Sequence, residues 1–164
     1  MKVVKRLFVP KNVWLLAGIF DIAFFDLVSK WLAERYLTTP LVFFKGYLTL
    51  HVSYNPGIAF SIPIPNVAMI LATPILIFAI TYLLVKTCNL NHLATKFALI
   101  FMIGGALGNF INRIWNGAVT DFIDFSFFPS FNLADAYLTV GAFLIIVFYG
   151  KIAVNTDGTR SATT

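Results

Sequence analysis

Two neighbouring segments in the last third of the chain carry acids suited to paired-carboxylate chemistry. Asp121 and Asp124 lie within residues 119–125, and Asp135 follows in the run Phe131-Asn132-Leu133-Ala134-Asp135. If 119–125 is extended, Asp121 and Asp124 point to opposite faces, so a catalytic pair must join one of them to Asp135. Two close carboxylates share a proton and titrate as a unit: one activates a water as base while the other protonates the carbonyl or leaving amine. The pattern predicts a paired-aspartate hydrolase.

A structural explanation competes for part of this pattern. Asn132 is a natural N-cap for a helix that begins after it, with Asp135 at the third helical position. Capping explains Asn132 fully, and the favourable helix dipole explains Asp135 in part.

Acids and a lysine also interrupt the first apolar segment. Asp26 and Lys30 are four residues apart, and Ser29 is three from Asp26, so the three side chains can share one helix face. They form either an interfacial ion pair with a snorkelling lysine or the wall of a polar site. Asp21 lies at least a turn deeper, and we expect it to be a neutral, hydrogen-bonded packing residue.

A run of small residues, Gly104-Gly105-Ala106-Leu107-Gly108, leads into Asn109, Asn112 and Arg113. Tight helix packing accounts for the glycines without a ligand. The three polar side chains end an apolar segment and need hydrogen-bonding partners where there is little water. We expect them to orient carboxylates or a substrate backbone.

The composition places these residues in a membrane protein. The 164 residues are 59% hydrophobic and 12% charged, and the mean hydropathy is +0.85, a balance that a soluble domain of this size could not hide from water. Four segments qualify as spans: 12–31, 67–85, 97–111 and 132–150. We predict an all-α membrane bundle of four helices with a small external β-sheet.

The distribution of charge predicts the orientation. Segments 1–12, 86–96 and 151–164 hold eight of the 12 basic residues and are predicted to be cytoplasmic, which leaves 32–66 and 112–131 outside. Most acids then lie near the outer face, where we expect the chemistry.

Residues 1–154 form one predicted domain and 155–164 a disordered cytoplasmic tail. Asp21 and Asp26 and the lack of a small-residue cleavage site argue for a retained first span rather than a cleaved signal peptide.

The first external loop contains a predicted strand. Apolar and polar side chains alternate from 48 to 55, and Asn55-Pro56-Gly57 then forms a turn. A small sheet is expected to rest on the membrane.

Taken together, these features resemble the lipoprotein signal peptidase family, also called signal peptidase II, over nearly the whole chain. Five landmarks occur in order: Asp26 with Ser29-Lys30, Asn55-Pro56-Gly57-Ile58-Ala59-Phe60, Gly104 to Asn109 with Asn112-Arg113, Val119-Thr120-Asp121-Phe122, and Phe131-Asn132-Leu133-Ala134-Asp135. The family usually has aspartate immediately before the arginine of the third landmark, whereas this chain has Asn112. Because asparagine keeps the hydrogen-bonding shape, we expect activity to survive.

The resemblance implies an aspartyl endopeptidase of the bacterial inner membrane. Asp121 and Asp135 would be the catalytic dyad. The implied supporting or substrate-binding residues are Asp26, Lys30, Asn55, Gly57, Asn109, Asn112, Arg113 and Asn132. The implied substrate is a prolipoprotein that carries diacylglycerol on a cysteine and is cut just before that cysteine.

Other functional classes remain as alternatives. A small transporter or channel subunit would line an ion path with its acids and Arg113, and a non-catalytic assembly partner would not need them. The single Cys88 offers no disulfide or zinc framework. We expect no metal or cofactor, no nucleic-acid partner, contact with membrane lipids, and a monomer.

Overall fold

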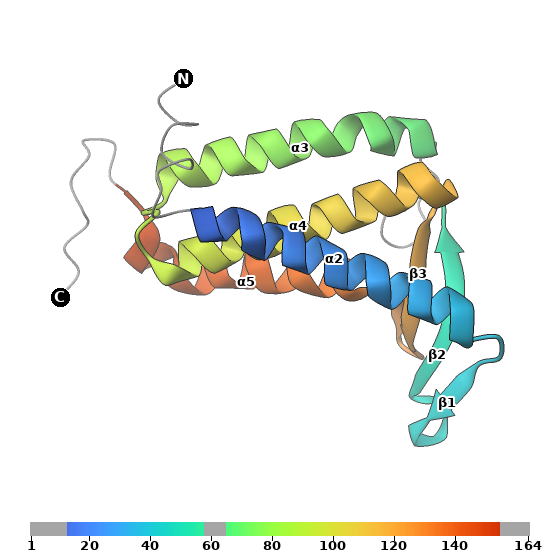
Figure 1. Ribbon diagram of the computed structural model, residues 1–164. Coiled ribbons are helices and arrows are strands. Elements are labelled where there is room, and N and C mark those ends of the chain that lie inside the picture. The colour runs from blue at the N-terminus through green and yellow to red at the C-terminus, as the bar shows by residue number, and fades with distance from the viewer. Residues whose placement is uncertain (1–12, 58–64, 155–164) are drawn as a thin grey trace.

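The computed structural model describes residues 13–57 and 65–154 (Figure 1). The elements are α2 (Val13–Tyr36), β1 (Leu41–Phe43), η2 (Phe44–Gly46), β2 (Leu48–Asn55), α3 (Asn66–Thr87), α4 (Leu93–Asn116), β3 (Val119–Phe125), β4 (Phe128–Phe131) and α5 (Leu133–Ile152). The predicted N-terminal basic segment, the C-terminal tail and Ile58-Ala59-Phe60 lie outside the described residues.

Four long helices run side by side, and the sheet lies at one end of them (Figure 1). Within the described residues, α3, α4 and α5 are long and apolar enough to cross a membrane. Helix α2 is as long as α4, with 24 residues, but contains Asp21, Asp26 and Lys30. The membrane bundle and its small sheet are thus found as predicted.

The third helix is longer than the sequence suggested. We predicted a span at 97–111, whereas α4 runs from Leu93 to Asn116 and is followed by Gly117, whose φ of 74° is the left-handed conformation that favours glycine after a helix. The helix extends past the predicted span, and Asn112 and Arg113 in this extension are buried against protein. Asn112 accepts from the Thr120 amide, and Arg113 donates to the Gly57 carbonyl.

The small residues of α4 let its neighbours approach closely. A Cβ atom built on Gly104 would lie 2.7 Å from the Ile22 side chain of α2, and one on Gly105 would lie 2.7 Å from the Ala134 carbonyl oxygen of α5. Tight packing therefore accounts for these two glycines, which bring α2 and α5 close to the backbone of α4.

The sheet is antiparallel with the order β1-β2-β3-β4. The predicted strand at 48–55 is confirmed as β2, and the predicted turn begins with the Gly57 amide donating to Asn55 Oδ1 at 3.0 Å. In the β2–β3 pair Ser53 lies opposite Asp121. The register places Asp121 at the end of the sheet nearest the helices.

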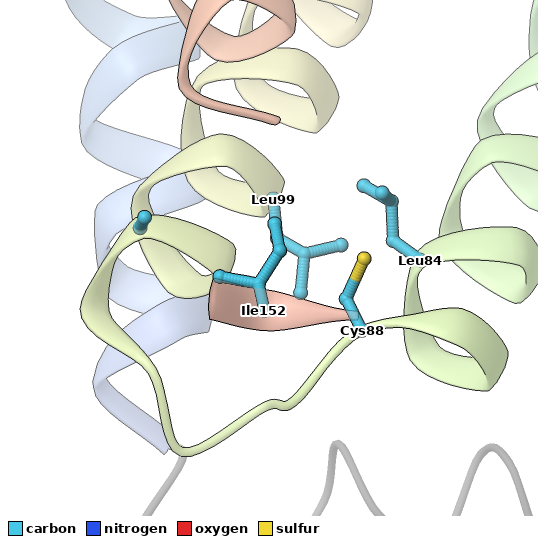
Figure 2. Packing of buried hydrophobic residues seen from close by; sticks show 5 residues of the cluster. Leu84, Cys88, Leu99 and Ile152 are labelled. Carbon is cyan, nitrogen blue, oxygen red and sulfur yellow. The ribbon is translucent and has the colours of Figure 1, made fainter. Parts of the chain in front are cut away.

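At the other end of the bundle, the chain closes around a small apolar cluster. Leu84, Cys88, Leu99 and Ile152 are buried together there (Figure 2). The backbone of Cys88 forms an isolated antiparallel β-bridge with that of Ala153. The starts of α2 and α4 and the ends of α3 and α5 all lie at this end (Figure 1). Cys88 serves as a packing residue.

Asp21 differs from the prediction. We expected a hydrogen-bonded packing residue, but its side chain is exposed on α2, and it has no hydrogen-bond partner among the described residues. Five residues of helix correspond to about 140° of rotation, so Asp21 points away from the side of α2 that buries Asp26.

Candidate active site

Asp121 and Asp135 come together through a single asparagine. Asp121 lies in β3 and accepts a 2.6 Å hydrogen bond from the side-chain amide of Asn132 on its Oδ1. The backbone amide of Asn132 donates to Asp135 Oδ2 at 3.3 Å. Both carboxylates therefore touch the same residue at the junction of β4 and α5. Asp124 lies elsewhere, 3.6 Å from His51 Nδ1, so the aspartate that is paired with Asp135 is Asp121.

Helix capping explains why Asn132 stands at this junction. Its Oδ1 accepts from the Asp135 amide at 3.1 Å, and Asp135 returns a bond to the Asn132 amide, which completes a capping box. The predicted N-cap is confirmed. Because the cap uses Asn132 Oδ1 and leaves its NH2 group free to donate to Asp121, one side chain starts α5 and holds Asp121.

A second amide holds Asp121 from β2. Asn55 Nδ2 donates to Asp121 Oδ2 at 3.2 Å, while Asn55 Oδ1 accepts from the Gly57 amide. The turn after β2 thereby orients the asparagine. The Gly57 carbonyl in turn accepts a 2.7 Å hydrogen bond from Arg113 Nη2, so α4 fixes the turn.

A buried polar chain reaches Asp135 from α2. Lys30 Nζ lies 2.7 Å from both Asp26 Oδ2 and Asn109 Oδ1, and Asn109 Nδ2 donates to Asp135 Oδ1 at 2.8 Å. Asp26 Oδ1 also accepts from the Ala134 amide at 2.8 Å. Asp26 and Lys30 are 0% and 1% exposed, so the ion pair lies inside the protein, hydrogen-bonded to Asn109, and is not an interfacial pair with a snorkelling lysine.

Arg113 and Asn112 play different parts in this arrangement. Arg113 is buried and lines a cavity, and its Nε has no hydrogen-bond partner among the residues that the structure describes. Asn112 Oδ1 accepts from the Thr120 backbone amide at 2.7 Å. Asn112 thus holds Thr120, the strand residue that precedes Asp121, rather than either carboxylate of the pair.

The two aspartates line an open cavity of about 830 Å³. Its polar part contains Asn55, Asn109 and Arg113 with Asp121 and Asp135. The larger apolar part is formed by side chains of β3, β4, the turn between them and α5, namely Phe125, Phe127, Phe128, Phe131, Leu138 and Val140. A long apolar ligand fits this lining, with its polar atoms next to the carboxylates.

Burial and charge change the acidity of the strand aspartate. Loss of solvent, followed by the nearby negative charge of Asp135, raises the pKa of Asp121 from 3.8 to about 6, although hydrogen bonds from Asn132 and Asn55 act in the opposite direction. The Asp121 carboxyl therefore exchanges its proton near neutral pH, which suits a group that gives and takes protons during a reaction.

Comparison with known families identifies the kind of protein that carries this site. Residues 19–150 match the family described as Signal peptidase (SPase) II. The chain belongs to the signal peptidase II family. The predicted family is confirmed, and the transporter alternative has no support from the comparisons.

Individual relatives agree with this assignment. The chain is 34% identical over 152 residues to a lipoprotein signal peptidase of Aquifex aeolicus, covering 87% of this chain and 89% of that protein. It is also 34% identical over 140 residues to one of Caldanaerobacter subterraneus subsp. tengcongensis, covering 80% and 94%.

Solved structures share the fold of this signal peptidase II chain. A bacterial membrane enzyme determined by the in meso method at 2.3 Å resolution superposes with a TM-score of 0.74 at 26% identity, covering 92% of this chain and 94% of that one. A second such enzyme, at 1.9 Å resolution, gives a TM-score of 0.71 at 29% identity and covers 82% and 91%.

Sequence reasoning missed one part of this signal peptidase II site. Glu34 accepts a hydrogen bond from Asn116, and it also accepts one from Thr120 on β3, the strand that carries Asp121. The spacing of both residues could have indicated this. Glu34 is four residues after Lys30, and Asn116 is four residues after Asn112, so each lies on the same helix face as a polar residue of the site. No cluster of three or more His, Cys, Asp or Glu suited to a metal is found within 13–57 and 65–154.

Proposed function

We propose that this member of the signal peptidase II family is an aspartyl endopeptidase whose dyad is Asp121 and Asp135. Family membership supports the removal of signal peptides from prolipoproteins. The proposed substrate carries diacylglycerol on a cysteine, and the bond cut is the one just before that cysteine. The observation that carries the aspartic mechanism is the hydrogen bonding of both carboxylates to Asn132 at the wall of a largely apolar cavity.

The raised pKa of Asp121 suggests how the pair divides its work. Asp121, which keeps a proton to higher pH than an ordinary aspartate, is the proton donor in this proposal, and Asp135 accepts a proton from the attacking water. Asp121 then protonates the carbonyl oxygen or the departing amine. Lys30 acts through Asn109, whose amide holds the Asp135 oxygen in place.

The remaining site residues have binding or supporting roles in this proposal. Arg113 and Asn55 line the cavity in which a peptide backbone would lie. Gly57 and Asn132 keep Arg113 and Asp121 in place, whereas Asn112 fixes β3. The aromatic lining supplied by β3 and β4 suits the acyl chains of the substrate.

We further infer that α2 is a fourth span. Its exposed side chains include Phe20, Phe24 and Phe25, which suit lipid, and its Asp26 and Lys30 are paired inside the protein, which lowers the cost of placing them in a membrane. Four spans put both termini in the cytoplasm and the sheet and dyad at the outer face of the inner membrane. Residues 1–154 then form one domain, which we propose acts as a monomer in contact with membrane lipids.

A cleavage assay with purified protein in lipid tests the function. A peptide with a diacylglyceryl-modified cysteine should be cut immediately before that cysteine, and the same peptide without the lipid should be cut far more slowly. Failure of folded protein to cut the lipidated peptide would refute the proposed substrate. Cleavage abolished by a chelator would refute the metal-free aspartic mechanism.

A further inference from the structure

Glu34 connects α2 to the strand that carries Asp121. The residue lies in the last turn of α2, and its Oε1 accepts two hydrogen bonds, from Thr120 Oγ1 at 2.5 Å and from Asn116 Nδ2 at 2.8 Å. Each carboxylate oxygen carries two lone pairs, so Oε1 can accept from both donors at once. Three elements, α2, α4 and β3, therefore meet at this one carboxylate.

Thr120 is held on its backbone as well as on its side chain. It is fully buried, its amide donates to Asn112 Oδ1 at 2.7 Å, and it lies opposite Tyr54 in the β2–β3 pair. Without Glu34 the Thr120 hydroxyl would lose the only hydrogen-bond partner that it has among the described residues, in a buried place, which is costly. The Glu34–Thr120–Asn112 contacts thus define where β3 begins.

The position of Thr120 matters because Asp121 is the next residue. Side chains alternate between the two faces of a strand, so a slip of one residue would turn the Asp121 carboxylate away from Asn132. Even a smaller displacement of the strand would change the distance between two groups that must share a proton.

We propose that Glu34 is a positioning residue of the aspartate pair, acting through Thr120 on Asp121. The inference rests on the proposed function of the pair. Lys30 and Glu34 are four residues apart on one stripe of α2, and they reach the two halves of the site by separate routes: Lys30 reaches Asp135 through Asn109, and Glu34 reaches Asp121 through Thr120. Helix α2 therefore sets the relative placement of the two carboxylates.

Steady-state cleavage of a lipidated peptide by the full-length protein tests this role. Glu34→Ala should lower kcat about 10-fold or more and leave KM within about twofold, because substrate binding is not altered. Glu34→Gln keeps an oxygen acceptor for Thr120 and should stay within about threefold of the parent. Arg35→Ala, an exposed neighbour on α2, is the matched control and should not change kcat.

A double-mutant comparison separates positioning from general loss of structure. Thr120→Val removes the hydroxyl that Glu34 accepts from, so Thr120→Val and Glu34→Ala should have equal effects, and the double variant should be no slower than either. Parent-like kcat in Glu34→Ala would overturn the proposal. So would multiplicative effects in the double variant, or equal losses in Glu34→Gln and Glu34→Ala.

Hydrogen exchange of the β3 amides provides a readout that does not depend on cleavage. Glu34→Ala should speed exchange at Thr120 and Asp121 relative to Arg35→Ala, with no comparable change in α3. Unchanged exchange would overturn the proposed contact even if the parent proved inactive on lipidated peptide. Absence of cleavage by the parent with the exchange difference present would refute the proposed function and leave the role of Glu34 in holding β3 established.

Discussion

Asn132 donates its side-chain amide to the Asp121 carboxylate at 2.6 Å while its own Oδ1 starts the helix that carries Asp135. Capping and alignment of the pair are therefore two uses of one side chain. They can be separated, because serine is also a good N-cap but lacks the amide that reaches Asp121.

Substitutions at Asn132 should separate its effect on stability, through the helix cap, from its effect on cleavage, through Asp121. Asn132→Ser should keep the thermal unfolding temperature in detergent near that of the parent, and Asn132→Ala should lose about 1 kcal/mol with the cap. Both should lose about 100-fold in kcat because Asp121 is no longer held. Calorimetry and peptide cleavage measure the two effects. Parent-like cleavage by Asn132→Ser would show that the asparagine is needed only as a cap.

The buried pair Asp26–Lys30 should matter more for orientation than for stability. Lys30→Met leaves the Asp26 charge unpaired in the protein interior and should cost about 3–5 kcal/mol of unfolding free energy. The double variant Asp26→Asn/Lys30→Met removes both charges, keeps an acceptor for the Ala134 amide, and should recover most of that stability.

Activity should not recover with it. Asn109 loses the lysine that orients its amide toward Asp135, so the stable double variant should remain at least about 10-fold slower than the parent. Denaturant unfolding together with single-turnover cleavage checks both effects. Full activity in the double variant would show that Lys30 has no role beyond its ion pair.

Tight packing between α4 and α5 predicts a strong effect of a single methyl group. In Gly105→Ala the new Cβ would meet the Ala134 carbonyl oxygen at 2.7 Å, next to the cap that places Asp135. The helices must move apart, and we expect a loss of about 1–3 kcal/mol together with reduced cleavage. Gly150→Ala in α5 is the control, because a Cβ there meets nothing within 4 Å. Equal behaviour of the two variants would contradict the packing argument.

The pH dependence of cleavage should follow from the pKa of Asp121. With that pKa near 6, the proton on Asp121 is lost as pH rises through this value, so kcat/KM should decline on the alkaline side. Asn55→Ala removes a donor that favours the ionised form, so the pKa of Asp121 should rise and the decline should move to higher pH. Rates between about pH 4.5 and 8.5 test this. A decline that moved to lower pH would contradict the assignment of the proton to Asp121.

The same pKa has a consequence for stability. The pKa of Asp121 is higher in the folded protein than its ordinary value of 3.8, so the folded state binds the proton more tightly than the unfolded chain. Its contribution to stability is fully present below 3.8 and is lost as pH rises through about 6. Asp121→Asn should therefore flatten the dependence of unfolding on pH in this window.

Local patterns in the sequence were enough to predict several elements of the site. Alternation from Leu48 to Asn55 predicted β2, and the spacing of Asn132 and Asp135 predicted the cap. These features depend on contacts within a few residues, which is why spacing reveals them. Strand β1 has only three residues, all exposed, and shows no alternation from which it could have been predicted.

Long-range contacts were beyond such reasoning. Glu34 meets Thr120 across 86 positions of sequence, and no local pattern states which helix will face which strand. Asp21 is a different case, because its position about 140° around the helix from Asp26 already placed it on another face. Counting rotation as well as depth would have corrected that prediction.

Exchange of each aspartate for asparagine tests the central claim most directly. Asp121→Asn and Asp135→Asn preserve size and hydrogen-bonding shape, and each should abolish cleavage of the lipidated peptide while the protein stays inserted and folded. Asp124→Asn lies on the same strand, outside the pair, and should cleave like the parent. Normal cleavage by either dyad variant, or loss of cleavage in Asp124→Asn equal to theirs, would contradict the assignment of Asp121 and Asp135.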